Sequence, residues 1–249
     1  MKITIVVPCY NSMKFLEQCM TSVLNQDYED CIVWAYDNES TDGTHEYLLD
    51  LEKKHEKLTV FQVPNIYPNG YGEAQEHIME NIKTDYVTFV GSDDYITPNY
   101  ISNYMKVIAH NPDKIKCVQS GLKGVKEGRL ENSLSMTHYY KNLEEFKQRA
   151  TFRSPVNTPT VVYHKSLVRF FRTHIAHEAA KVSCIGAGDY DTFCHLADIG
   201  IFVYPVPACL GYHYRWHPDQ STWKVHEEKQ NGYDYDRIIQ DYWKKKWNL

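Results

Sequence analysis

Two adjacent carboxylates follow an apolar run in the first half of the chain. Residues Tyr86–Val90 are apolar or β-prone, which is typical of a strand covered on both faces of a parallel sheet, and a Gly-Ser pair leads from them to Asp93 and Asp94. Open α/β sheets bind ligands at the carboxyl ends of their strands. Neighbouring carboxylates repel each other, and a divalent cation bound to a phosphate supplies a counter-charge. The pair therefore predicts either a metal-assisted phosphate site or a solvated Asp-Asp turn.

Strands that alternate with helices must position this pair. Besides Tyr86–Val90, strands are predicted at Ile3–Val7, Cys31–Tyr36 and Leu58–Val63, with helix-like segments between them. Connections of this length predict right-handed crossovers and a mostly parallel sheet. We expect Pro8-Cys9-Tyr10-Asn11 to end the first strand. Thr97 and Pro98 should cap and begin the helix after the Asp pair.

Residues 1–110 thus form a nucleotide-binding half, although neither G-x-G-x-x-G nor a P-loop motif is present. The second half, residues 111–222, predicts a smaller antiparallel part with a turn near Gly124–Gly128, a helix at Leu143–Ala150 and a late strand within Leu210–His217. No linker separates the halves. We expect one α/β domain over 1–222, its mostly parallel central sheet flanked by helices, and a helical tail over 223–249.

Composition and charge narrow the class of protein. The chain has 249 residues, and 27 basic against 32 acidic side chains give a net charge of −5, which argues against nucleic-acid binding. Seven cysteines without a C-x-x-C pair predict neither a disulfide framework nor a zinc site. The chain enters a strand at once and has no apolar run of about 18 residues. We therefore expect a cytoplasmic protein without a signal peptide or a membrane span.

Four motifs stand in order along the chain. They are Val6-Val-Pro-Cys-Tyr-Asn11, Tyr36-Asp-Asn-Glu-Ser-Thr-Asp-Gly-Thr44, Val90-Gly-Ser-Asp-Asp-Tyr-Ile-Thr-Pro98 and Ala187-Gly-Asp-Tyr-Asp191. Together they resemble family 2 glycosyltransferases of the GT-A fold, over roughly residues 1–220. The resemblance implies a GT-A-type nucleotide-binding fold, a nucleoside-diphosphate sugar donor, most often a UDP-sugar, and Mn²⁺ or Mg²⁺.

By this resemblance, two loops hold the nucleotide. Pro8, Tyr10 and Asn11 belong to the loop that holds the base, with Tyr10 as the stacking face. Asp37 and Asn38 follow the second strand, where the family usually has two carboxylates. An amide at Asn38 still offers a donor and an acceptor to a uracil edge. The alternative for Tyr10 is an aromatic residue that simply ends a strand.

The resemblance also places the metal. It implies that Asp93 lies near the ribose or sugar and that Asp94 binds the metal, while Gly91 stands where the family often has a further Asp. Arg215-Trp-His217 resembles a late segment in which a histidine reaches the metal or the diphosphate, so His217 is a second candidate ligand. The alternative for His217 is a solvated side chain.

The catalytic base is expected in the last motif. Asp189 matches the family's base, and Asp191, two residues on, is a second catalytic candidate that points elsewhere once the helix has begun. Gly188 replaces the family's preceding Glu. The alternative for Asp189 is a helix N-cap. These residues imply an inverting, metal-dependent transferase that moves the sugar to a hydroxyl of a glycan or lipid-linked acceptor, with Asp189 as general base.

Two other functions stay open at this point. A non-catalytic nucleotide- or sugar-binding module would keep the fold, and the missing Glu and Asp favour it. A nucleotidyltransferase would normally carry a glycine-rich basic loop after the first strand, whereas Cys9–Met13 contains neither Gly nor Arg.

The tail, Trp223–Leu249, shows apolar and aromatic residues at helical spacing from Tyr235 onward. Such a face packs against its own domain or a second subunit, as in a homodimer. Alternatively, tryptophans beside the lysines at 244–246 suit peripheral contact with an anionic membrane surface.

Overall fold

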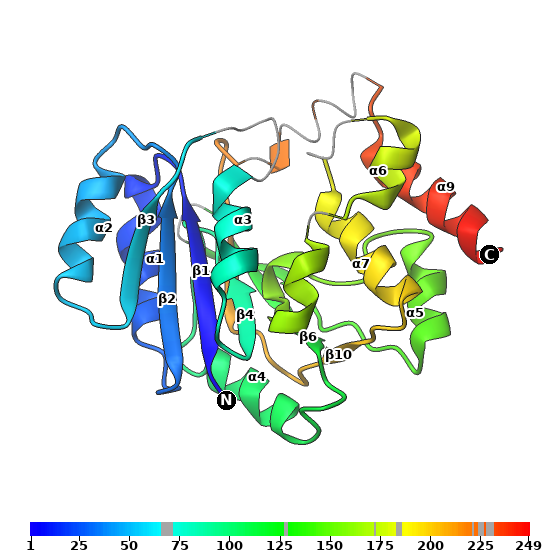
Figure 1. Ribbon diagram of the computed structural model, residues 1–249, viewed down its shortest axis with the longest axis horizontal. Coiled ribbons are helices and arrows are strands. Elements are labelled where there is room, and N and C mark those ends of the chain that lie inside the picture. Colours follow the sequence, from blue (N-terminus) through cyan, green and yellow to red (C-terminus); the bar gives the residue numbers. More distant parts are fainter. Residues whose placement is uncertain are drawn as a thin grey trace.

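The computed structural model describes residues 1–65, 72–126, 129–171, 173–182, 186–220, 222–223, 227 and 232–249. Within these ranges the chain folds around a seven-stranded sheet of order β10-β6-β9-β4-β1-β2-β3 (Figure 1). The strands are β1 (Ile3–Cys9), β2 (Cys31–Asp37), β3 (Leu58–Gln62), β4 (Tyr86–Phe89), β6 (Cys117–Gln119), β9 (Val162–His164) and β10 (Val203–Pro205). All neighbours pair in parallel except β9, which lies antiparallel between β4 and β6. The second half of the chain therefore completes the sheet that the first half begins.

Helices cover both faces of this sheet. They are α1 (Met13–Leu24), α2 (Thr44–Glu52), α3 (Gly72–Asn81), α4 (Tyr100–Ala109), α5 (Leu143–Ala150), α6 (Ile175–Ala180), α7 (Gly188–Asp198) and α9 (Tyr235–Trp247), with 3₁₀ turns η1 (Thr158–Thr160) and η2 (Lys165–Phe170). Alternation along β1 sends Ile3, Ile5 and Val7 into a core with α1, α2 and α4. Val6 points to the opposite core, which α3, α5 and α7 close. Burial on both faces explains the unbroken apolar runs in the sequence.

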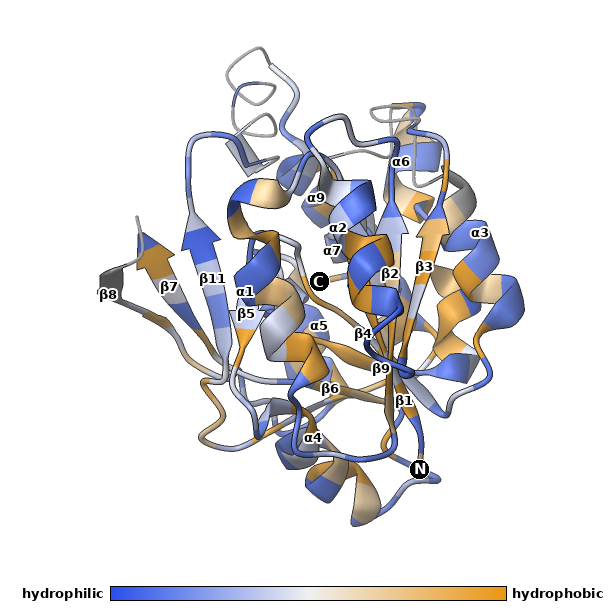
Figure 2. Ribbon diagram, turned by 90° about the vertical axis from the view of Figure 1, so that its left-hand side faces the viewer, coloured by the Kyte–Doolittle hydropathy of each residue, from blue (hydrophilic) through white to orange (hydrophobic). Residues whose placement is uncertain are grey.

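A second sheet, of order β5-β11-β7-β8, stands beside the first. Its strands are β5 (Tyr95–Ile96), β7 (Leu122–Lys126), β8 (Arg129–Ser135) and β11 (Tyr212–Trp216). Figure 2 shows β11 between β7 and β5. The pairs β5–β11 and β7–β8 are antiparallel, and β11–β7 is parallel. Because β5 follows the Asp pair directly, this pairing brings the late strand β11 to the end of β4.

The predicted fold class is confirmed, and one local prediction is wrong. The first strand ends inside the predicted segment, because β1 continues to Cys9 and keeps its parallel pairing with β2. The helix after the Asp pair does not begin at Pro98, because the residues before it form β5 and the Thr97 amide donates to the Gly211 carbonyl. Helix α4 begins instead at Tyr100, after Asn99. The predicted turn near Gly124–Gly128 lies between β7 and β8, and residues 127–128 are outside the described ranges.

The tail packs on its own domain. Tyr235, Ile239 and Trp243 of α9 are buried in a core with residues of α5, α6 and α7, and Figure 1 shows α9 beside α6 and α7. Lys246 pairs with Asp198 of α7 at 2.7 Å, while Lys244 and Lys245 are exposed. The apolar face predicted from sequence is thus occupied by the chain itself.

The cysteines in the described ranges are free and buried, and Cys184 lies outside those ranges. Burial raises the pKa of the Cys31 thiol to about 12, which keeps it protonated and unreactive. Among the described residues, no helix combines the length and apolar character needed to span a membrane.

Candidate functional site

The Asp pair sits in a tight turn at the carboxyl end of β4, and its two members have different surroundings. The Asp94 amide donates to the Gly91 carbonyl at 2.9 Å, which closes the turn. Asp94 is only 2% exposed, and β11 occupies both of its oxygens: Oδ1 accepts from the Arg215 amide at 2.8 Å and Oδ2 from the Tyr212 hydroxyl at 2.7 Å. The Asp93 side chain is 32% exposed. Asp94 therefore fastens β11 to the end of β4, and Asp93 stays partly accessible to solvent.

Burial and the nearby charge of Asp93 raise the pKa of Asp94 to about 8, although the Arg215 amide and the Tyr212 hydroxyl act in the opposite direction. A buried carboxylate that is already held by two protein donors leaves little room for a cation. This placement does not fit the predicted role of Asp94 as the metal ligand.

Asp93 and His217 form a more open pair. His217 Nε2 lies 2.9 Å from Asp93 Oδ2, and its ring rests on Phe15 with the centroids 4.9 Å apart. A Cβ at Gly91 would lie 2.7 Å from Asp93 Oδ1, so only glycine leaves room for the carboxylate in this orientation. Carboxylate and imidazole are both suitable ligands for manganese-type ions. The pair fits a divalent ion that takes its remaining ligands from phosphates and water.

A cluster of three His, Cys, Asp or Glu side chains placed to hold a metal ion is not found within the described part of the chain. A fixed positive charge is found instead. Arg215, 6% exposed, donates to the Asp93 carbonyl and to Gln18 Oε1, and its guanidinium lies 4.6 Å from the Phe15 ring centroid. It supplies part of the counter-charge that the Asp pair needs. Sequence reasoning had noted Arg215 only as part of a motif.

The loops after β1 and β2 meet beside this turn. Tyr10 is 55% exposed, and Pro8 is exposed as well. Asn11 has a positive φ of 47°. Its side-chain Oδ1 accepts from the Thr41 backbone amide at 2.8 Å, and its backbone amide donates to Ser40 Oγ at 2.9 Å. Asn11 therefore ties the two loops together, whereas the sequence had suggested direct contact with the nucleotide.

Asp37 and Asn38 also differ in exposure. Asp37 is fully buried and accepts from the Ser40 amide at 3.3 Å, so it orders the loop after β2. Asn38 is partly exposed, and its Nδ2 donates to the Cys9 carbonyl at 3.0 Å. This hydrogen bond fixes the orientation of the amide. Oδ1 of Asn38 is left as a hydrogen-bond acceptor.

The base loop is joined to the Asp turn. Ser12 Oγ lies 2.8 Å from Ser92 Oγ, and Ser12 also receives the Tyr10 amide at 3.1 Å. Because β1 pairs in parallel with both β2 and β4, the three strand ends lie on one edge of the sheet. Sequence reasoning did not identify Ser12 or Ser92, whose contact joins two loops 80 residues apart.

The two carboxylates of α7 also face different ways. Asp189 is exposed in the first turn. Asp191 has no exposed surface: Oδ1 accepts from Trp243 Nε1 at 2.6 Å and Oδ2 from the Ala176 amide at 2.7 Å. A carboxylate enclosed in this way does not reach a substrate, so the placement does not fit the predicted catalytic role of Asp191.

The Tyr214 hydroxyl is influenced by carboxylates from two motifs. Burial raises the pKa of this hydroxyl, and the charges of Asp94, Asp93 and Asp189 raise it further, while its hydrogen bond to Thr222 lowers it.

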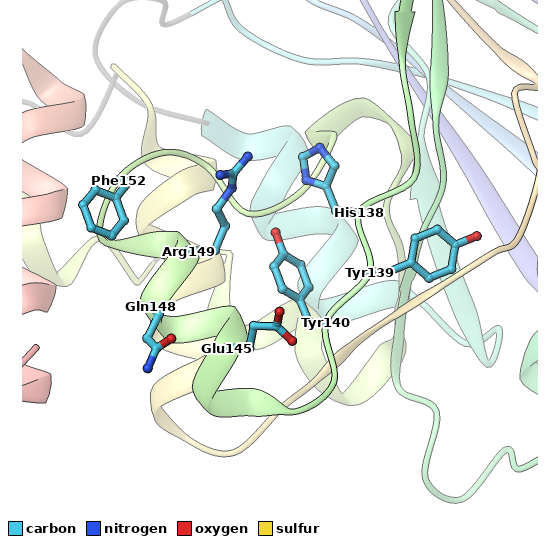
Figure 3. Close-up of a pocket in the computed structure, with 7 residues that line it drawn as sticks. All are labelled: His138, Tyr139, Tyr140, Glu145, Gln148, Arg149 and Phe152. Carbon is cyan, nitrogen blue, oxygen red and sulfur yellow. The ribbon is translucent and has the colours of Figure 1, made fainter.

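A pocket of about 460 Å³ lies elsewhere, between α5 and the residues that precede it (Figure 3). Tyr139 and Phe152 line it and are 59% and 70% exposed, and Arg149 and Gln148 contribute polar groups. None of its lining residues comes from the loops after β1, β2 or β4. The pocket is therefore separate from the Asp93 site.

Comparisons with known proteins bear on the family and the fold. Residues 4–173 match the family described as glycosyl transferase family 2. The chain is 32% identical over 127 residues to poly(ribitol-phosphate) beta-glucosyltransferase of Bacillus spizizenii, covering 50% of this chain and 20% of that protein. It is 25% identical over 232 residues to chondroitin synthase of Pasteurella multocida, covering 93% and 22%. The chain thus spans about a fifth of the length of these curated relatives.

Among solved structures, the fold resembles that of S. aureus TarS 1–349 in complex with UDP. The TM-score is 0.63 at 21% identity, and the alignment covers 98% of this chain and 69% of that one. This likeness confirms the GT-A fold. Since the family match covers well over half of the chain, the protein belongs to glycosyl transferase family 2.

Proposed function

We propose that this member of the family transfers a sugar from a UDP-sugar to a hydroxyl of a glycan or lipid-linked acceptor, with inversion at the anomeric carbon. The observation that carries the proposal is the partly exposed Asp93 carboxylate at the end of β4, paired with His217 and joined through Ser92 and Ser12 to the loop that bears Tyr10. This edge of the sheet is where an α/β fold binds a nucleotide.

Tyr10 and Asn38 are compatible with uracil as the base. The exposed Tyr10 ring offers a stacking face, and stacking alone does not select among bases. Asn38 Nδ2 is held by the Cys9 carbonyl, which leaves Oδ1 as an acceptor for an N–H group such as that of uracil. Because every nucleobase has an N–H group on its pairing edge, the choice of uracil rests on the family rather than on this contact. The TarS complex, which holds UDP, is consistent with this choice.

Asp93 and His217 are the residues that would hold Mn²⁺ or Mg²⁺ together with the donor diphosphate. When bound, the ion would neutralise the charge that develops on the leaving UDP. The Arg215 guanidinium donates to the Asp93 carbonyl and adds a permanent positive charge next to the Asp pair.

Asp189 is the proposed general base. Its exposed carboxylate takes the proton from the acceptor hydroxyl while that oxygen attacks the anomeric carbon. The bond between the anomeric carbon and the donor phosphate oxygen breaks on the opposite face, and UDP leaves with the electron pair. Inversion follows from this single displacement.

The proposal is tested by incubating the purified protein with a panel of UDP-sugars, with Mn²⁺ or with EDTA, and measuring released UDP. We expect one UDP-sugar to be consumed in the presence of Mn²⁺, with the sugar recovered on an acceptor or on water by mass spectrometry. Tight UDP binding without release from any donor would instead support the non-catalytic module. Pyrophosphate release from UTP and a sugar phosphate would identify a nucleotidyltransferase.

Replacing Tyr10 by alanine is expected to weaken UDP binding by about 1–3 kcal/mol, because the base loses its stacking face. Isothermal titration calorimetry with UDP measures this difference. Tyr139→Ala is the matched control, since Tyr139 is similarly exposed at 59% but belongs to the separate pocket. An equal UDP affinity in wild type and Tyr10→Ala would remove Tyr10 from the site.

A further inference from the structure

Helix α9 is tied to both ends of α7 by two tryptophans. Trp243 Nε1 donates to Asp191 Oδ1 at 2.6 Å, in the first turn of α7. Trp247 Nε1 donates to Asp198 Oδ1 at 3.0 Å, at the last residue of the same helix. The two contacts have the same chemistry, and only the first lies beside Asp189.

Asp191 connects three helices through one carboxylate. Its Oδ2 accepts from the Ala176 and His177 amides, at 2.7 and 3.4 Å, in the first turn of α6, while Oδ1 is held by α9. Asp191 and Trp243 are both 0% exposed. A buried carboxylate depends on such donors, because an unpaired one carries a large desolvation penalty. The first turn of α7 is thereby fixed relative to α6 and α9.

Helix α9 also packs against the residues just before Asp189. A Cβ at Gly186 would lie 2.1 Å from Cδ2 of Tyr235, so this ring sits directly on the Gly186 backbone. Ala187 follows in a left-handed conformation with φ 54°, and α7 begins at the next residue. Residues on both sides of Asp189 are therefore held by α9. Asp189 itself is exposed, so its direction depends on the turn that carries it.

We propose that α9 positions the catalytic base: Trp243, acting through Asp191, and Tyr235, acting on Gly186, fix the turn that directs Asp189 toward the acceptor hydroxyl. This inference rests on the proposed role of Asp189 as base. Trp243 and Asp191 are positioning residues and do not touch the substrate. A displacement of about 1 Å in such a group costs on the order of 100-fold in rate.

The two tryptophans provide a matched test in the full chain. Trp243→Phe and Trp247→Phe each remove one indole N–H and keep an aromatic ring. For both variants and wild type, kcat and the donor KM are measured by UDP release, UDP affinity by calorimetry, and folding by circular dichroism with the melting temperature. We expect Trp243→Phe to lower kcat on the order of 10–100-fold with UDP affinity unchanged within about twofold. Trp247→Phe should keep wild-type kcat.

A folded Trp243→Phe with wild-type kcat would overturn the inference. An equal loss of kcat in both variants would also overturn it, since the effect would then belong to general packing of α9. If Trp243→Phe does not fold, Asp191→Asn carries the test, because its single side-chain oxygen cannot accept from both Trp243 and the α6 amides. Where both variants fold, the loss of kcat in the double variant should be smaller than the product of the two single losses, because both act through the side chain at position 191.

Asp189→Asn is measured alongside, to separate the two proposals. An active Asp189→Asn would show that the base assignment is wrong, whatever Trp243→Phe does. An inactive Asp189→Asn with a fully active Trp243→Phe would leave the proposed function intact and remove only the positioning role of α9.

Discussion

Substitution of Asp189 by asparagine is expected to lower sugar transfer by about 10²–10⁴-fold, the range that general base catalysis contributes. The amide keeps the size of the side chain and removes its ability to accept the acceptor proton. Because Asp189 is exposed and lies on α7, away from the loops that bear Tyr10 and Asn38, UDP affinity should stay near the wild-type value. Initial rates of UDP release with acceptor, together with calorimetry with UDP, measure both quantities.

Asp113→Asn is a suitable control, since Asp113 is also exposed but precedes β6, at the amino ends of the parallel strands and not at their carboxyl ends. Both variants should melt at the wild-type temperature. Transfer at an undiminished rate by Asp189→Asn would show that another group takes the proton. A loss of UDP affinity in the same variant would instead place Asp189 in donor binding.

The sequence was sufficient for the parts of the site that depend on local pattern. Apolar runs predicted β1, β2, β3 and β4 to within two residues, because strands buried on both faces contain almost no polar residue. Parallel order then required their carboxyl ends to share one edge. The position of Tyr10, Asn38 and Asp93 at that edge follows directly from these two facts.

Within each carboxylate pair, which aspartate is buried depends on contacts between residues far apart in sequence, and no local pattern reveals these contacts. Asp94 is buried by residues 118 and 121 positions away on β11, whereas Asp93, its neighbour in sequence, is left exposed. In the same way, Asp191 is enclosed by Trp243, 52 positions later. Helix α6 was also missed, since its six residues are too few for a periodic pattern, and its first turn is held by Asp191.

Asp93→Asn and Asp94→Asn are expected to differ sharply, although the two residues are adjacent and the substitution is the same. Mn²⁺ should increase the affinity of the wild type for UDP. Asp93→Asn should abolish this increase, because a neutral amide is a weak ligand for a hard cation and the partner of His217 is lost. The affinity for Mn²⁺ should fall by at least about 10–100-fold, which is the cost of removing an outer-sphere partner of a metal ligand. Calorimetric titration of UDP with and without Mn²⁺ measures it.

Asp94→Asn should keep the response to Mn²⁺, for a geometric reason. Its Oδ1 still accepts from the Arg215 amide, while the buried Tyr212 hydroxyl loses Oδ2 as its acceptor, so we expect a lower melting temperature. β11 therefore stays attached to the end of β4 through the Arg215 amide. If Asp94→Asn abolishes the Mn²⁺ response while Asp93→Asn preserves it, Asp94 is the ligand after all, and its carboxylate must leave Tyr212 and Arg215 when the donor binds.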